Sequence, residues 1–179
     1  MSSKSNGSSS KRSQGFSLVE LMVAITILGV LLAIALPGFQ SFVTSNRLTA
    51  QINELVGDLS FARNQAGTRG LNVSVCIAAS STTCQSSGTD WAAGRLIYAD
   101  FNGNGSIDAS NNEILKYVQP LDGGVTLITA GPKITFRPGG GLLPSSLWTF
   151  KLCAPGVEKG KKITLPFSGR ATATNDSCT

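Results

Sequence analysis

The chain has 179 residues, enough for one folded domain and a membrane anchor, and 15 basic against 10 acidic residues give a formal net charge of +5. It contains no histidine, which excludes Ser-His and Cys-His nucleophile arrangements and removes the commonest metal ligand. Because no paired carboxylates stand in a recognisable catalytic setting either, the composition predicts that the protein is not an enzyme and has no cofactor.

Residues 1–15 form a serine-rich leader with basic residues near its end, and an apolar stretch follows from Leu18 to Leu36. Glu20 is the only ionised group in that stretch. As a helix rising about 1.5 Å per residue, the stretch spans most of the hydrocarbon core of a bilayer. Basic residues are concentrated before it, so the positive-inside rule keeps the leader in the cytoplasm and exports the remainder.

Glu20 is the feature that a plain membrane anchor leaves unexplained. A carboxylate near the start of a membrane helix is costly and marks function by default. If the chain is cut after Gly15, the new amine of Phe16 supplies a positive partner. The alternative is an ordinary secretory signal, cut after the apolar core near Ala33-Ile34-Ala35, in which Glu20 would have no purpose. Losing the leader lowers the charge from +5 to +2, which argues weakly for a polyanionic partner.

A Gly15-Phe16 junction after a basic leader, with Glu20 as the fifth residue counted from Phe16, resembles the class III signal of type IV pilins and type II secretion pseudopilins. The resemblance implies that a prepilin peptidase cleaves after Gly15 and that Phe16 is then N-methylated. It also implies that Glu20 pairs with the Phe16 amine of a neighbouring subunit during assembly.

One long helix is predicted from Phe16 to about Ala66. Pro37 lies inside it, where the apolar run gives way to polar residues, and predicts a kink or local unwinding. Beyond Pro37, apolar residues recur at steps of three and four and predict an amphipathic segment packed on a globular core. Charged residues, Asp58 among them, are expected mostly on its other faces. Gly67 and Gly70 provide the stop.

From Leu71 onward, short β-like runs alternate with glycine-rich turns. The predicted strands are Asn72–Ala78, Arg95–Asp100, Ile114–Val118, Val125–Ile128, Lys133–Arg137, Trp148–Cys153 and Lys161–Pro166. Trp91 and Trp148 are expected in the core or at its rim. Phe136, Phe150 and Phe167 are expected in the core.

The predicted fold class is α+β, a long, partly transmembrane N-terminal helix packed on a C-terminal antiparallel β-sheet or sandwich domain. The expected divisions are a cleaved leader, a transmembrane and assembly half of the helix, an amphipathic half of the helix, and a periplasmic β domain. Their ranges are 1–15, 16–36, 37–70 and 71–179.

Four cysteines lie in the exported part, namely Cys76, Cys84, Cys153 and Cys178. An even number in an oxidising compartment suggests two disulfides, with three possible pairings. We favour Cys76–Cys84, which closes a short Ser/Thr-rich loop, and Cys153–Cys178, which ties the C-terminal tail to a strand. A zinc site is disfavoured because the CxxC spacing is absent.

The segment from Trp91 to Asp108, continued by Glu113-Ile114-Leu115, combines a W-x-x-G strand, an Asp/Asn/Gly turn and a returning strand. Together with the helix segment Leu59–Ala66, it resembles the GspH/FimT family. With the leader, the resemblance covers the anchor, the helix and roughly half of the β domain.

The resemblance implies a minor pilin of a type IV pilus or, alternatively, a type II secretion pseudopilin. Such a subunit crosses the bacterial inner membrane once, with the β domain in the periplasm, and then enters the pilus or pseudopilus at its tip, where it primes assembly. The expected partners are other minor pilins or pseudopilins, the major pilin, the prepilin peptidase and the inner membrane.

The run from Asp100 to Asp108 follows the first nine positions of a calcium loop, with oxygen-bearing side chains at Asp100, Asn102, Asn104 and Asp108 and a glycine at the sixth position. The usual glutamate at the twelfth position is replaced by Asn111, and Glu113 comes two residues late. The alternative is a hairpin turn in which these side chains bond backbone groups.

Lys159, Lys161, Lys162 and Arg170 form a basic group near the C terminus. Minor pilins of the FimT type that bind DNA carry a C-terminal Gly-Arg-x-Arg motif, and here Gly169-Arg170 matches its first half while Thr172 replaces the second arginine. The resemblance therefore leaves DNA binding for natural transformation as an alternative function of another class. A lysine pair at the start of a strand is otherwise a solvated edge.

Overall fold

The computed structural model describes residues 17–108 and 112–178. Its contacts divide the chain into a first unit, residues 1–40, and a second unit, residues 41–179. A long N-terminal helix followed by antiparallel sheets is the fold class that the sequence predicts.

Helix α1, Leu18–Arg69, begins and ends with recognisable capping residues. Ser17 precedes it, and the Ser17 side-chain oxygen accepts a hydrogen bond from the Glu20 N–H at 3.2 Å. At the other end Gly70 has a φ of 67°, and its N–H donates to the Ala66 carbonyl at 3.1 Å. Gly67 lies inside the helix, so Gly70 alone supplies the predicted stop. The helix continues through Pro37, where the kink stays a prediction.

The strands of the second unit form two antiparallel sheets in the described residues. One has the order β3-β2-β1-β5-β6, built from β1 Asn72–Ile77, β2 Arg95–Asp100, β3 Ile114–Val118, β5 Lys133–Phe136 and β6 Leu142–Leu143. The other has the order β4-β7-β8-β9, built from β4 Thr126–Ile128, β7 Trp148–Cys153, β8 Lys159–Leu165 and β9 Thr172–Ser177.

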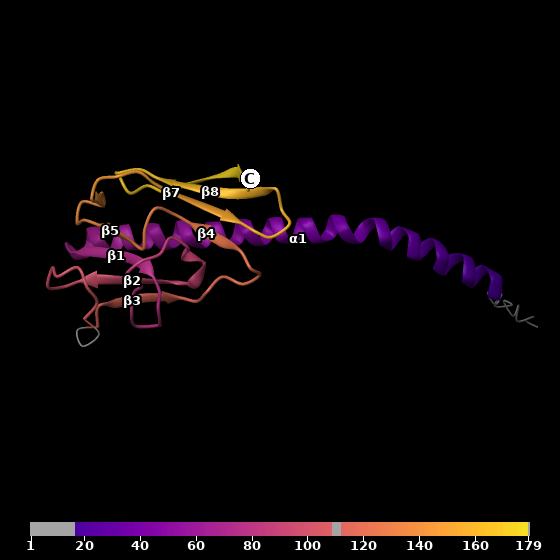
Figure 1. The fold of residues 1–179 in the computed structure, drawn as a ribbon, viewed down its shortest axis with the longest axis horizontal. Helices are drawn as coiled ribbons and strands as arrows, with labels where there is room; N and C mark the ends of the chain where they lie inside the picture. Colours follow the sequence, from indigo (N-terminus) through magenta and orange to yellow (C-terminus); the bar gives the residue numbers. More distant parts are fainter. Residues whose placement is uncertain (1–16, 109–111, 179) are drawn as a thin grey trace, which may run out of the picture. The chain divides into compact units, whose positions relative to one another are not determined.

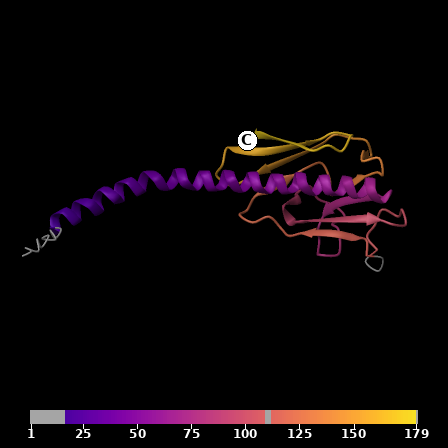
Figure 2. The same cartoon turned by 180° about the vertical axis from the view of Figure 1, so that it is seen from behind.

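The segment of α1 that belongs to the second unit runs between the two sheets (Figures 1 and 2). Its apolar stripe is buried to within 2% exposure and packs against residues of both sheets in one cluster. The stripe consists of Leu48, Ile52, Leu55, Leu59, Ala62 and Ala66. The amphipathic pattern predicted beyond Pro37 is therefore the core face of the helix.

Trp91 lies in the short 3₁₀ helix η1, Trp91–Ala93, and is fully buried in this core. Its ring meets that of Phe150 edge to face, with ring centres 5.1 Å apart, and its indole N–H donates to the Gly131 carbonyl at 2.8 Å. The indole is therefore buried with its polar atom satisfied.

Strand β1 is buried on both faces. Val73, Val75 and Ile77 pack into the main core, while Cys76 packs on the other face with Leu96 and Tyr98. This second cluster also includes half-buried Ile107, from the turn after β2. Strand β2 is buried on both faces in the same way, which explains its continuous apolar run from Leu96 to Ala99.

Besides ends of the helix and of four strands that are displaced by one to three residues, three features differ from the sequence-based prediction. Strands β6 and β9 were not predicted, and the side chain of Phe167, predicted in the core, is 68% exposed. Asp58, expected on a solvated face of the helix, is 1% exposed. Strand β9 was not predicted because its sequence is polar. It has no apolar face of its own and is held by its antiparallel pairing with β8.

Candidate functional site

The apolar side chains of α1 before Arg47 are mostly exposed, whereas the apolar stripe that follows is buried. The large apolar side chains from Leu18 to Val43 are between 48% and 75% exposed. The helix contains a window long and apolar enough to cross a membrane. A continuous apolar surface of this length requires lipid or neighbouring helices as its environment.

Glu20 lies in the first turn of α1, three residues after the Ser17 cap. A carboxylate at this position is favoured by the positive end of the helix dipole. The Ser17-Leu18-Val19-Glu20 spacing is that of a capping box, a signal for the helix start that was available from the sequence. Gly15 and Phe16, the predicted processing residues, lie outside the described residues.

A buried ionic network ties α1 to the first sheet. The Arg95 guanidinium, 0% exposed, contacts the Asp58 carboxylate through Nε at 2.6 Å and through Nη2 at 2.5 Å. Lys116 on β3 reaches the other oxygen of Asp58 at 2.6 Å. The network was missed from the sequence, because Asp58 and Arg95 are 37 residues apart and arginine is mostly exposed unless it is paired.

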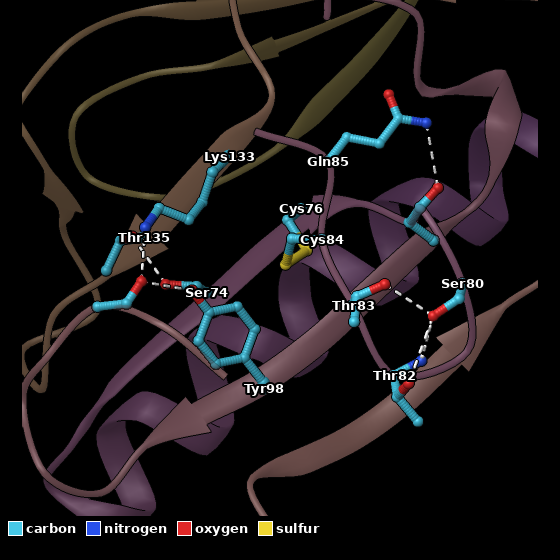
Figure 3. The surroundings of a disulfide bond; sticks show 12 residues. Ser74, Cys76, Ser80, Thr82, Thr83, Cys84, Gln85, Tyr98, Lys133 and Thr135 are labelled. Atoms are coloured by element: carbon cyan, nitrogen blue, oxygen red, sulfur yellow. Dashed lines mark hydrogen bonds between the residues drawn. A yellow bond between two sulfur atoms is a disulfide. The ribbon is translucent and has the colours of Figure 1, made fainter. Parts of the chain in front are cut away.

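Both cysteine pairs favoured by the sequence are joined by disulfides. Cys76 on β1 is bonded to Cys84, with their Cα atoms 5.8 Å apart, and closes the loop that Figure 3 shows beside Tyr98. Cys153 at the end of β7 is bonded to Cys178, just after β9, with Cα atoms 5.7 Å apart. The second bond reaches across β8 at Gly160, where an added Cβ would collide with the Cys178 sulfur and the Leu152 carbonyl.

The turn after β2 folds its polar side chains onto its own backbone. Asp100 accepts a hydrogen bond from the Gly105 N–H at 2.8 Å, and Asn102 accepts one from the Asn104 N–H at 3.0 Å. These are the bonds expected of the hairpin-turn interpretation. They also resemble the internal bonding of a calcium loop, so they do not separate the two interpretations. Asn111 lies outside the described residues.

Buried Glu113 closes this turn from the β3 side. Its carboxylate oxygens accept hydrogen bonds from the backbone N–H groups of Phe101 at 3.1 Å and Asp108 at 2.6 Å. Two side chains hold the Gly105 carbonyl, because the Tyr98 hydroxyl donates to it at 3.0 Å and the Lys133 ammonium at 2.7 Å. The turn is thus anchored to β2, β3 and β5.

The basic group predicted near the C terminus is spread over the β8–β9 hairpin. Lys161 and Lys162 are neighbours on β8, so their side chains leave opposite faces of the sheet. Strand β8 lies between β7 and β9, so it is not the edge strand that was expected. Lys159 begins β8, whereas Arg170 lies in the turn that follows the other end of this strand. At about 3.3 Å per residue, the length of β8 separates the two residues by about 20 Å.

Two arginines from other parts of the chain, Arg63 and Arg137, line a hollow beside the turn that carries Arg170. The turn that carries it contacts the glycine-rich turn 138–141 through Gly169, which packs on the Gly140 carbonyl. Arg63 of α1 donates to that carbonyl at 3.0 Å, and Arg137 lines the same hollow as Arg63. Because Arg63 and Arg137 are far apart in the chain, no sequence pattern predicts that they line one hollow.

Comparison with known proteins supports the pilin fold. Two crystal structures of the type IV minor pilin FimU from Pseudomonas aeruginosa strain PAO1 match with TM-scores of 0.55 and 0.57. They are 21% and 22% identical to this chain, and the matches cover 73% and 77% of it and 99% of each FimU chain. At this level of identity the likeness establishes the fold alone.

Two family models match the sequence. The model described as Type II transport protein GspH matches residues 51–169, and that described as Prokaryotic N-terminal methylation motif matches residues 10–36. Since the first match covers well over half of the chain, the protein belongs to the GspH family.

Curated relatives carry fimbrial names. A probable minor fimbrial protein of Dichelobacter nodosus is 30% identical over 115 residues, covering 62% of this chain and 65% of that protein. A fimbrial protein of Pseudomonas aeruginosa is 29% identical over 103 residues, covering 58% and 63%. Fimbrial protein Q of Moraxella bovis is 45% identical over 42 residues, covering 24% and 27%. The chain thus spans less than two thirds of the length of these relatives.

Proposed function

We propose that this protein is a minor pilin, held in the inner membrane by the first half of α1 before it enters a type IV pilus at or near the tip. The observation that carries the proposal is the change along α1, whose large apolar side chains are exposed up to Val43, whereas its apolar stripe from Leu48 is buried against the sheets. An apolar helix without intramolecular packing suits both lipid and the helical core of a fibre. The match to the methylation motif supports the same assignment.

In this proposal the prepilin peptidase cuts after Gly15 and methylates Phe16, and Glu20 then sets the register of assembly. A carboxylate in lipid destabilises the isolated subunit, and pairing with the Phe16 ammonium of a neighbour removes that penalty. The partners are other minor pilins and the major pilin. The role is structural rather than catalytic.

Substitution of Glu20 tests the proposal. We expect Glu20→Gln to leave cleavage intact, measured as the N-terminal mass of the membrane form, because the junction at Gly15 is unchanged. Incorporation into sheared pili should fall at least about tenfold, which corresponds to a loss of about 1.4 kcal/mol. Ser17→Ala is the matched control, because it removes the helix cap and keeps the charge. Normal incorporation of the Glu20 variant would refute the pairing.

The runner-up is a type II secretion pseudopilin, the class that the GspH description names. Deleting the gene in the parent bacterium separates the two. Loss of surface pili with normal protein secretion supports the pilus, whereas the reverse result supports the secretion system.

DNA binding is a second candidate function, favoured by one observation. Arg63 and Arg137 line a hollow with Phe167 and Ser168, from the turn that also carries Arg170. Arginines gathered at one place can contact successive phosphates, which gives affinity that falls with salt. Of the predicted basic group, only Arg170 lies in the turn that borders this hollow.

A DNA titration of the detergent-solubilised protein at several salt concentrations tests this candidate. We expect Arg170→Ala and Arg63→Ala each to weaken binding and to reduce the salt slope by about 0.9, the value for one lost phosphate contact. Lys159→Ala, at the other end of the hairpin, is the matched control and should change neither. Absence of binding at low salt, or equal effects of all three variants, would refute DNA binding at this site.

A further inference from the structure

Side chains of the turn after β2 converge on a single point. The Asp108 Oδ2 atom accepts hydrogen bonds from Asn102 Nδ2 at 2.5 Å and from Asn104 Nδ2 at 3.0 Å. The two amides therefore meet one carboxylate oxygen, although the three residues are separated along the chain. The Asn102 and Asn104 side-chain oxygens each accept one backbone N–H of the turn, from Asn104 and Ser106, and each keeps a second lone pair for a cation.

Asp100 has a buried carboxylate oxygen that the bonds of the turn leave without a partner. The residue is only 5% exposed, and its Oδ1 atom is buried without a hydrogen-bond partner among the described residues. Its other oxygen accepts the Gly105 N–H, which orients the carboxylate into the turn. Leaving a buried carboxylate oxygen unpartnered costs free energy, so the atom is expected to have a ligand that the polypeptide does not supply.

The charge around the turn is also unbalanced. Asp100, Asp108 and Glu113 contribute three carboxylates, and Lys133 contributes the ammonium that contacts the Gly105 carbonyl. Two negative charges remain, one of them on a carboxylate that is 5% exposed. A divalent cation would neutralise them.

We propose that the turn binds a calcium ion through Asp100 Oδ1, the side-chain oxygens of Asn102 and Asn104, and the Asp108 carboxylate, with water completing the shell. Calcium accepts six to eight oxygen ligands in flexible geometry and tolerates neutral amides, whereas magnesium demands a tighter octahedron. Asn102 and Asn104 are exposed, so the ion and its water reach the site from solvent.

The ligand set is mixed, which distinguishes it from a cluster of acidic residues. In the described residues no three acidic or cysteine side chains gather as metal ligands. Two carboxylates and two amides carry less charge than the ligands of a high-affinity loop. We therefore expect a dissociation constant of about 10⁻⁴ to 10⁻³ M, the range of extracellular calcium modules.

Terbium luminescence provides a direct test on the detergent-solubilised full chain. Terbium occupies calcium sites and is excited by nearby aromatic rings, and the Tyr98 hydroxyl lies 3.0 Å from the Gly105 carbonyl in this turn. We expect luminescence that saturates with terbium and is displaced by millimolar calcium but not by equal magnesium. Calcium that fails to displace terbium would overturn the proposal.

Asp100→Asn is the decisive variant, because asparagine retains an oxygen for the Gly105 N–H and loses the charge. We expect it to weaken calcium binding at least about tenfold, while Asp122→Asn, which removes an exposed carboxylate from another turn, changes nothing. Equal weakening by both variants would refute a specific site. If Asp100→Asn does not fold, Asp108→Asn takes its place.

The melting temperature of the unsubstituted protein provides a test of calcium binding that does not depend on the variants. With 10 mM calcium in place of chelator, ligand linkage predicts a rise in melting temperature of about 3–5 °C for a dissociation constant near 1 mM. A melting temperature unchanged by calcium, together with no heat of binding in titration calorimetry, would overturn the proposal whatever the variants do.

Discussion

At the scale of single residues, an ionic contact joins α1 to the first sheet in addition to the apolar stripe. Asp58 and Arg95 are both almost completely buried, and Lys116 reaches Asp58 from the exposed side. Withdrawing these charges from water is costly, and the cost is offset only while each charge has its partner. Removing one member of the Asp58–Arg95 pair should therefore destabilise the fold much more than replacing both with apolar side chains.

Asp58→Ala should lower the free energy of unfolding by about 3–5 kcal/mol, because it leaves the Arg95 guanidinium buried without a counter-charge. Urea denaturation followed by tryptophan fluorescence measures the change. Glu54→Ala is the matched control one turn earlier on the same helix. Its carboxylate is 45% exposed and 3.7 Å from Arg95, so a loss of no more than about 1 kcal/mol is expected.

A second comparison separates charge from packing. Asp58→Leu combined with Arg95→Met should recover most of the stability lost in Asp58→Ala, because a buried ion pair can be replaced by apolar side chains of similar volume. Equal losses in Asp58→Ala and Glu54→Ala would contradict the importance assigned to burial.

At the scale of elements, some strands can be predicted from their local sequence, whereas others exist only through their pairing with a neighbouring strand. Strand β2 and strand β7 have the predicted bounds, because β-branched and aromatic residues bounded by turn signals mark them locally. Strand β9 is polar and exposed, and only its pairing with β8 and the Cys153–Cys178 bond reveal it. Its existence depends on the position of another strand, which no local pattern contains.

The candidate sites divide in the same way. The Asp100–Asp108 turn and Glu20 could be identified from spacing, because each site is contiguous in the chain. The hollow lined by Arg63 and Arg137 could not be identified in this way, because the glycine-rich turn 138–141 creates it by packing against Arg63 of α1 and against Gly169.

At the scale of the whole molecule, one helix serves two environments. Residues up to 40 belong to the first unit, and the stripe from Leu48 to Ala66 belongs to the core of the second. Most of the stability of a helix in a folded protein comes from packing of its apolar face, so the buried stripe stabilises the second half. The second unit also contains both disulfides and both sheets.

A chain that begins at Ser41 should therefore fold without detergent, because it keeps the buried stripe and loses nearly all of the exposed apolar helix. We expect a monomer in size-exclusion chromatography, both disulfides by mass spectrometry, and one cooperative melting transition. The full chain should require detergent under the same conditions. As a control, Leu55→Ala in the shortened chain should destabilise it by about 2–5 kcal/mol, since Leu55 is fully buried. If the shortened chain aggregates, or if Leu55→Ala has no effect, the second unit does not derive its stability from the helix stripe.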